Sequence, residues 1–194
     1  NRRAISRRSA NGTGQEELLY QHGSGALIVL TDWSRDGRFL TFWEGNRMLL
    51  LPVSADRTPI ALGQDDFFGR GGRFSPDGRT LAWASNRSGT FHVLTRGIDL
   101  SAVPASPPRA AGEARQASNA AAIGGIFWRQ DARELFYLSL PPRQSMMAVG
   151  VNGDGALGPP RKLFELRTGV GAPAQLSSVA TPDGQRFAFA VNLR

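Results

Sequence analysis

A ten-residue pattern occurs four times in this chain and constrains the fold more than any other feature. The copies read WSRDGRFLTF (33–42), FSPDGRTLAW (74–83), WRQDARELFY (128–137) and ATPDGQRFAF (180–189). The fourth position is always aspartate, and successive aspartates are 41, 54 and 52 residues apart. Repetition at intervals of this length is the sequence signature of an array of supersecondary units.

Each copy predicts a β-hairpin. In Ser-Pro-Asp-Gly the proline fixes φ, the aspartate side chain bonds back to the turn backbone, and glycine accepts a positive φ. The predicted turn residues are Asp36, Gly37, Asp77, Gly78, Asp131, Asp183 and Gly184. Ala132 stands where the other copies have glycine. We therefore expect Ala132 either to adopt a left-handed conformation, at a cost of about 1 kcal/mol, or to use a slightly different turn.

The apolar residues of the repeat predict the core. After each turn they alternate, which places the large side chains on one face of a strand. The first position is aromatic in three copies, Trp33, Phe74 and Trp128, and we expect these side chains to be buried between sheets. The fourth copy has Ala180 there, so its unit is expected to be the least well packed.

Two further strand-like segments follow each of the first three hairpins, which gives four strands per unit. No segment has the apolar period of a helix. The sequence therefore predicts an all-β chain, a β-propeller of four-stranded antiparallel blades with about four blades' worth of strand. The expected divisions are a half-blade at 1–22, blades at 26–62, 72–118 and 125–167, and a half-blade at 176–194.

The two half-blades leave two arrangements open. They can pair and close a four-bladed ring, or they can be the ends of a partial arc of a larger propeller. We favour the arc, since the chain has no initiator Met and ends just after a strand. The segment 101–125 is rich in Ala, Pro, Gly and Ser and predicts an extended connection between strands.

The composition excludes several classes of protein. Hydrophobic residues make up 41% and charged residues 20%, as in a globular domain. The longest apolar run, ALIVL (26–30), is far shorter than a membrane span, so we expect no membrane contact by this segment. Of the 23 basic residues all but Lys162 are arginines, and they are scattered rather than gathered on one face. We therefore expect no nucleic-acid partner.

The chain also lacks the residues of an enzyme. It has no cysteine, only two histidines, and no G-x-S-x-G motif for a serine nucleophile. His92 alternates with Phe91 and Val93, as a surface or hydrogen-bonded histidine on a strand does, and His22 ends a strand before a loop. No group of residues has metal-ligand spacing. We expect no catalysis, no cofactor and no metal.

One connection is a candidate binding site. In a propeller, the connection that enters an innermost strand lies on an open face, and GQDDFFGRGG (63–72) is the most distinctive of these. Its candidate residues are Asp65, Asp66, Phe67, Phe68 and Arg70. The phenylalanines are suited to contact a protein or peptide, with a small ligand as a second option. In the alternative interpretation, one or both of these phenylalanines pack beneath the connection and form a small extension of the core.

The repeat resembles a known family. W/F-S-x-D-G-R-x-L-x-F is similar to the PD40, or WD40-like, repeat of TolB-type β-propellers. Segments such as GRFSPDGRTLAWASNRSGTFHV (72–93) look most like the propeller region of bacterial receptor-like serine/threonine kinases. The resemblance implies a non-enzymatic ligand- or protein-binding module, part of a sensor domain, in an extracytoplasmic or periplasmic location. It also leaves an alternative, the substrate-gating propeller of a prolyl-oligopeptidase-type serine peptidase without its catalytic domain.

Overall fold

The computed structural model describes residues 3–23, 25–54, 57–62, 69–100, 109–140, 144–166 and 178–189. In these residues all regular structure is β-strand, and the strands form antiparallel sheets. Since no helix occurs there, the described chain has no helix that is long and apolar enough to cross a membrane.

Three sheets have four strands each, taken in chain order. The first contains β3 (Ile28–Trp33), β4 (Phe39–Glu44), β5 (Arg47–Pro52) and β6 (Ile60–Ala61). The second contains β7 (Gly69–Phe74), β8 (Thr80–Ser85), β9 (His92–Asp99) and β10 (Arg109–Gln116). The third contains β11 (Ala122–Trp128), β12 (Glu134–Ser139), β13 (Ser145–Gly150) and β14 (Arg161–Glu165). Two hairpins flank them, β1 (Arg3–Arg7) with β2 (Glu17–His22), and β15 (Ser178–Ala180) with β16 (Phe187–Phe189).

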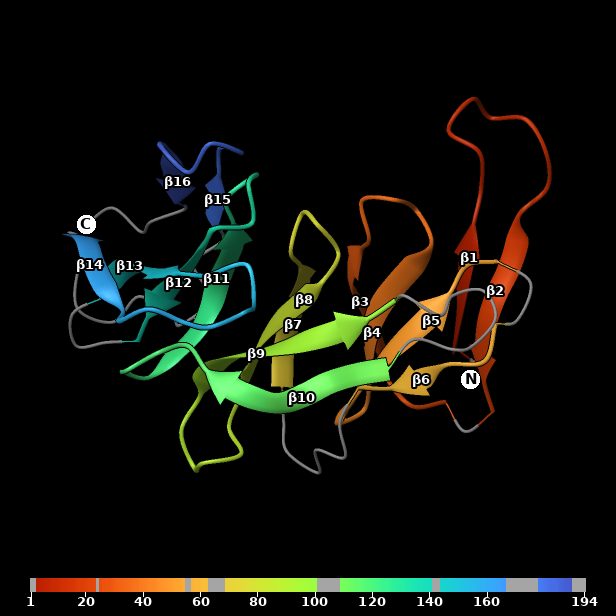
Figure 1. Ribbon diagram of the computed structural model, residues 1–194. Helices are drawn as coiled ribbons and strands as arrows, with labels where there is room; N and C mark the ends of the chain where they lie inside the picture. Colours follow the sequence, from red (N-terminus) through yellow and green to blue (C-terminus); the bar gives the residue numbers. More distant parts are fainter. Residues whose placement is uncertain are drawn as a thin grey trace, which may run out of the picture.

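The sheets are arranged as the blades of a β-propeller. Their first strands lie side by side, because β3 contacts β7, β7 contacts β11, and β11 contacts β15. Figure 1 shows the sheets following one another along an open arc, with the β1–β2 hairpin at one end and β15–β16 at the other. The described sheets do not close into a ring. This confirms the predicted fold class, all-β with propeller blades in a partial arc.

Alternating residues bury both faces of the middle sheets, as the period-two pattern predicted. In β8, Leu81 and Trp83 belong to the core shared with the first sheet. Ala82 and Ala84 point the other way, into the core shared with the third sheet. The terminal β15–β16 hairpin has no fully buried residue in its strands, in line with the weaker packing expected for the Ala180 unit.

The four repeat turns share one hydrogen-bond pattern. The backbone N–H of the fifth repeat residue donates to the carbonyl of the second, at 2.8 Å for Gly37 and Gly78 and 2.9 Å for Ala132 and Gly184. The aspartate Oδ1 accepts the N–H two residues later, as in the bond from Arg79 to Asp77 (3.1 Å). The same bond occurs at Asp36, Asp131 and Asp183.

The third turn resolves the question raised by Ala132. Its φ is 60°, the only positive φ of a non-glycine residue in the described chain, so Ala132 takes the left-handed conformation. Arg129 replaces the serine or threonine of the other turns and holds Asp131 with two bonds of 2.8 Å, from Nε and Nη2. The turn thus keeps its geometry with different side chains.

Two segments predicted as connections contribute residues to strands. Gly69–Gly72 belong to β7, because Gly69 and Arg70 pair with Ser85 and Ala84 of β8, and the indole of Trp43 leaves no room for a side chain at residue 69. A strand-like segment was expected at 113–118, and β10 overlaps it but begins earlier, at Arg109, because residues 109–111 also pair with β9. In both cases tertiary pairing decides the conformation rather than local propensity.

A candidate binding groove at the turn end of the inner strands

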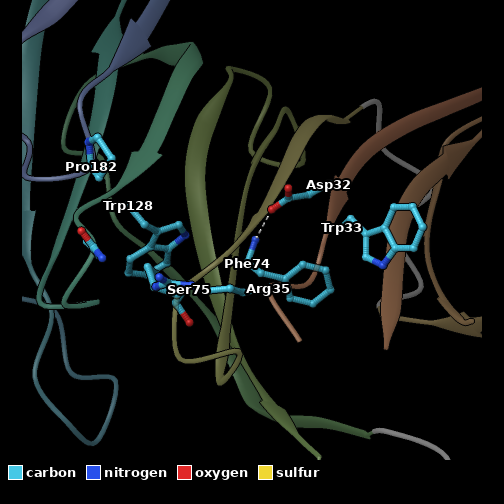
Figure 2. Close-up of a pocket in the computed structure, with 9 residues that line it drawn as sticks. Asp32, Trp33, Arg35, Phe74, Ser75, Trp128 and Pro182 are labelled. Carbon is cyan, nitrogen blue, oxygen red and sulfur yellow. Dashed lines mark hydrogen bonds between the residues drawn. The ribbon is translucent and has the colours of Figure 1, made fainter. Parts of the chain in front are cut away.

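Residues from equivalent positions of the repeat gather at one end of β3, β7 and β11. They line a cavity of about 360 Å³ that contains Asp32, Trp33, Arg35, Phe74, Ser75, Pro76, Trp128, Gln130 and Pro182. A second cavity of about 230 Å³ shares Phe74, Pro76, Trp128 and Pro182 with the first. We refer to the two together as the aromatic groove. Figure 2 shows Asp32 and Trp33 on one side of the groove and Trp128 and Pro182 on the other.

The groove presents ring faces rather than polar ring atoms. Trp33 is 46% exposed, and its Nε1 donates to the carbonyl of Gly37 at 3.0 Å. Trp128 donates its Nε1 to the carbonyl of Arg73 at 3.1 Å, which ties the third sheet to the second. Phe74, between them in the strand order, is 7% exposed. Because both indole N–H groups are already bonded, a ligand is left with the apolar and π surfaces of these rings.

Two opposite charges lie beside these rings. The Asp32 carboxylate is partly buried, accepts the backbone N–H of Phe74 at 2.9 Å, and lies 3.5 Å from the Arg73 guanidinium. Arg35 is exposed, and its side chain makes no hydrogen bond or ion pair with the described residues. The groove therefore has a fixed acidic group and a guanidinium whose donors are available.

Of the binding-site residues predicted from the sequence, the structure describes Arg70 alone. Asp65, Asp66, Phe67 and Phe68 are outside the described residues. Arg70 is half-buried on β7 opposite Ala84, near the end of the strand away from Phe74.

The aromatic groove was not identified from the sequence as a site. A signal for it was present, since the first repeat position supplies Trp33, Phe74 and Trp128 and the third supplies Arg35, Pro76, Gln130 and Pro182. The first position was interpreted as core instead. That interpretation is correct for Phe74 and wrong for the exposed Trp33, which has no inner strand on one side.

The histidines have structural partners. His92 Nδ1 lies 3.0 Å from the buried Ser118 Oγ and 3.2 Å from Gln116 Nε2, so it is hydrogen-bonded as expected. His22 does end a strand, β2, and its Nδ1 lies 2.7 Å from the buried Glu44. Tyr20 donates to the same carboxylate at 2.5 Å, and burial together with this bond raises the pKa of Tyr20 to about 12. These contacts join the β1–β2 hairpin to the first sheet.

Metal binding by the described part of the chain would need a group of ligand side chains close together. There, no three His, Cys, Asp or Glu side chains come together as a metal site. The repeated aspartates each serve their own turn.

Comparisons with known proteins identify the fold alone. No family model and no curated protein sequence matches the chain. Among solved structures, TolB from Acinetobacter baumannii is 18% identical with a TM-score of 0.65, over 98% of this chain and 43% of that one. A puromycin-hydrolyzing peptidase from Mycobacterium tuberculosis is 17% identical with a TM-score of 0.63, over 96% of this chain and 35% of that one.

A chain of a nidogen/laminin complex is 12% identical with a TM-score of 0.52, over 79% of this chain and 54% of that one. The chain thus spans 35% to 54% of the length of these three structures. The fold is a partial β-propeller similar to part of TolB.

Proposed function

We propose that the chain is a non-enzymatic binding module whose aromatic groove takes an extended polypeptide segment. The observation that carries the proposal is the convergence of Trp33, Phe74 and Trp128 from three successive sheets on one groove. Tryptophan and arginine are the side chains that most often dominate protein recognition. At about 360 Å³, the main cavity is within the range of ligand pockets.

The form of the groove favours a peptide over a compact polar ligand. Aromatic and proline faces bind extended chains through their apolar surfaces, as in the recognition of polyproline II segments. Asp32 and Arg35 would then orient the segment through its charged side chains or its backbone. One of the structurally similar proteins is itself part of a protein complex, nidogen with laminin, which supports a protein partner for a propeller of this kind.

A peptide-library selection followed by calorimetry tests the proposal. Peptides selected on the wild-type protein are titrated into Trp33→Ala and Arg35→Ala, both at exposed positions. We expect each change to weaken binding at least about tenfold with an unchanged unfolding midpoint. Leu18→Ala, which removes an exposed apolar side chain on β2, is the matched control and should bind normally. If no peptide binds, or if selected peptides bind both groove variants as well as wild type, the proposal is wrong.

The wider role that we propose is part of the sensor domain of a bacterial receptor kinase, in an extracytoplasmic compartment. The sequence resemblance to such propellers supports it. Asp65, Asp66, Phe67, Phe68 and Arg70 stay a second proposed contact surface, of which the described residue, Arg70, lies on β7 away from Phe74. Sequencing the gene outward tests the role, because a kinase catalytic loop and a membrane span are expected upstream.

A substrate-gating propeller of a serine peptidase is the second candidate. The similarity to the puromycin-hydrolyzing peptidase favours it. A G-x-S-x-G motif downstream, followed by Asp and His, would establish this role and exclude the kinase.

A further inference from the structure

A second cavity system, which shares Ser75 with the aromatic groove, lies between the second and third four-stranded sheets. Its main cavity has a volume of about 400 Å³ and is lined by turn residues that include Asp77, Arg79, Asp131 and Arg133. A smaller cavity of about 250 Å³ shares Arg79 with it. We refer to the two cavities together as the trough; no aromatic side chain lines either of them, and charged side chains line both.

The trough is lined by arginines from one repeat position. Arg38, Arg79 and Arg133 are all the sixth residue of their repeat. In the first repeat, Arg38 turns back on its own aspartate, with Nε 2.7 Å from Asp36 Oδ2. The side chains of Arg79 and Arg133 make no hydrogen bond or ion pair with the described residues. The same position therefore supplies two guanidiniums whose donors are unused, and both line one cavity.

The carboxylates of the main cavity are already bonded. Asp131 is held by two bonds from Arg129, which lower its pKa to about 2. Asp77 accepts Ser75 Oγ at 2.5 Å and the backbone N–H of Arg79 at 3.1 Å. Both acids are thus bonded within their own turns, whereas the guanidiniums of Arg79 and Arg133 keep their donors unused.

The smaller cavity of the trough is lined by charged side chains of both signs. Arg96 and Arg115 bond to backbone carbonyls, at 2.8 Å to Leu62 and 3.1 Å to Gly155, so both serve the fold. Asp154 accepts the N–H of Ala156 at 2.9 Å, and Glu113 is exposed at the rim. Among the arginines that line the trough, those with unused donors are therefore Arg79 and Arg133.

We propose that Arg79 and Arg133 form a binding site for a phosphate-type oxyanion, either free phosphate or the phosphoryl group of a small phosphomonoester. The planar guanidinium presents paired donors that match the oxygens of phosphate bidentately. Two guanidiniums can donate to several oxygens of one ligand. A phosphate group has more oxygens than a carboxylate group, which has two oxygens and one negative charge, so a phosphate group matches the pair of arginines better. The volume of the trough accommodates such a ligand together with water.

Calorimetric titration with inorganic phosphate at constant ionic strength tests the site. We expect saturable 1:1 binding that Arg79→Gln and Arg133→Gln each weaken at least tenfold. Arg38→Gln is the matched control, because it changes the same repeat position where the guanidinium is bonded to Asp36. Unfolding midpoints of all variants establish that they are folded. Sulfate should compete, and acetate at equal ionic strength should not.

Two results would overturn the site. Equal losses in all three variants would mean a general effect of net charge, and unchanged binding in the Arg79 and Arg133 variants would place phosphate elsewhere.

Glycerol 1-phosphate distinguishes the two sources of the oxyanion. If it binds more tightly than inorganic phosphate, the trough takes a phosphomonoester; if more weakly, it takes the free ion. Because the aromatic groove is not involved, Trp33→Ala should leave phosphate binding unchanged, so this site and the proposed peptide groove can fail separately.

Discussion

The inner strands β3 and β7 carry the same repeat and yet differ in what surrounds them. Each leads into an aspartate-centred turn with the same hydrogen bonds. Phe74 at the end of β7 is 7% exposed, whereas its equivalent Trp33 at the end of β3 is 46% exposed. Val29 and Leu30 of β3 are exposed as well. Turn geometry is therefore set locally, whereas burial depends on the position of a strand in the arc.

The cause is the number of neighbouring inner strands. β7 contacts β3 on one side and β11 on the other. In the described chain, β3 contacts the inner strand β7 alone, because the β1–β2 hairpin beside its sheet has no inner pair. Within the described chain, an aromatic residue at the same repeat position is thus core in one blade and groove wall in another. Substitutions at equivalent positions can separate what the local sequence determines, the turn geometry, from what the position of a strand in the arc determines, the burial of its side chains.

The largest expected effect is at the first repeat position. Phe74→Ala should lower the free energy of unfolding by about 3–5 kcal/mol, because it removes a large buried side chain. Trp33→Ala should cost no more than about 1 kcal/mol despite the larger side chain, because Trp33 is half in solvent. Urea denaturation of the two variants measures the difference, and similar losses would contradict the positional account.

The next largest effect is expected when a methyl group is added at one of two glycines of the inner strands. A Cβ on Gly69 would lie 2.0 Å from the indole of Trp43, so Gly69→Ala should destabilise by about 1–3 kcal/mol. On β11, Gly124 has no heavy atom within 4 Å of the same position. Gly124→Ala should therefore change stability by no more than about 0.5 kcal/mol. If thermal unfolding shows equal effects, Trp43 does not pack on β7.

The turns should respond alike wherever they lie. Ala132→Gly is expected to stabilise by about 1 kcal/mol, because glycine adopts the observed φ of 60° without strain. Gly78→Ala should destabilise by about 1 kcal/mol, since φ is 71° there and its new Cβ meets only Leu100 at 3.8 Å. Chemical denaturation measures both, and a stabilising Gly78→Ala would show that the two turns differ.

The smallest effect is the acid dependence contributed by Asp131. The bonds from Arg129 and from the backbone N–H of Arg133 lower its pKa from 3.8 to about 2. A lowered pKa in the folded state gives stabilisation that is present above pH 3.8 and is lost as the pH falls through about 2. Asp131→Asn should therefore flatten the pH profile of stability in this interval. An unchanged slope in denaturation series at pH 5, 3 and 2 would mean that Asp131 is not bonded in this way.

Local chemistry made much of the fold predictable. The Asp-Gly turns, the alternation after them and the four-stranded units all follow from short-range rules, and even the strain at Ala132 was foreseeable. The strand at Gly69–Gly72 was not, because it depends on pairing with β8, and its glycines make room for Trp43 of another sheet. The strand expected at 113–118 begins earlier than expected, at Arg109, since the small residues before it also pair with β9.

The groove and the trough were beyond sequence reasoning for a related reason. The repeat identifies which residues are equivalent, such as Trp33 and Phe74, but it does not say which of them a neighbouring sheet covers. Nor does it say that Arg38 bonds to its own aspartate while Arg79 at the same position does not.

The central claim is that equivalent sheets stand side by side with β7 between its neighbours, and the indole protons of two tryptophans test it most directly. Trp43 Nε1 donates to Gly71 at 2.6 Å from the first sheet, and Trp128 Nε1 donates to Arg73 at 3.1 Å from the third. In a nitrogen-edited NOE spectrum, we expect cross-peaks from the Trp43 indole proton to Gly71 and from the Trp128 indole proton to Arg73. Cross-peaks from both indoles to residues of their own sheets alone would contradict the propeller arrangement.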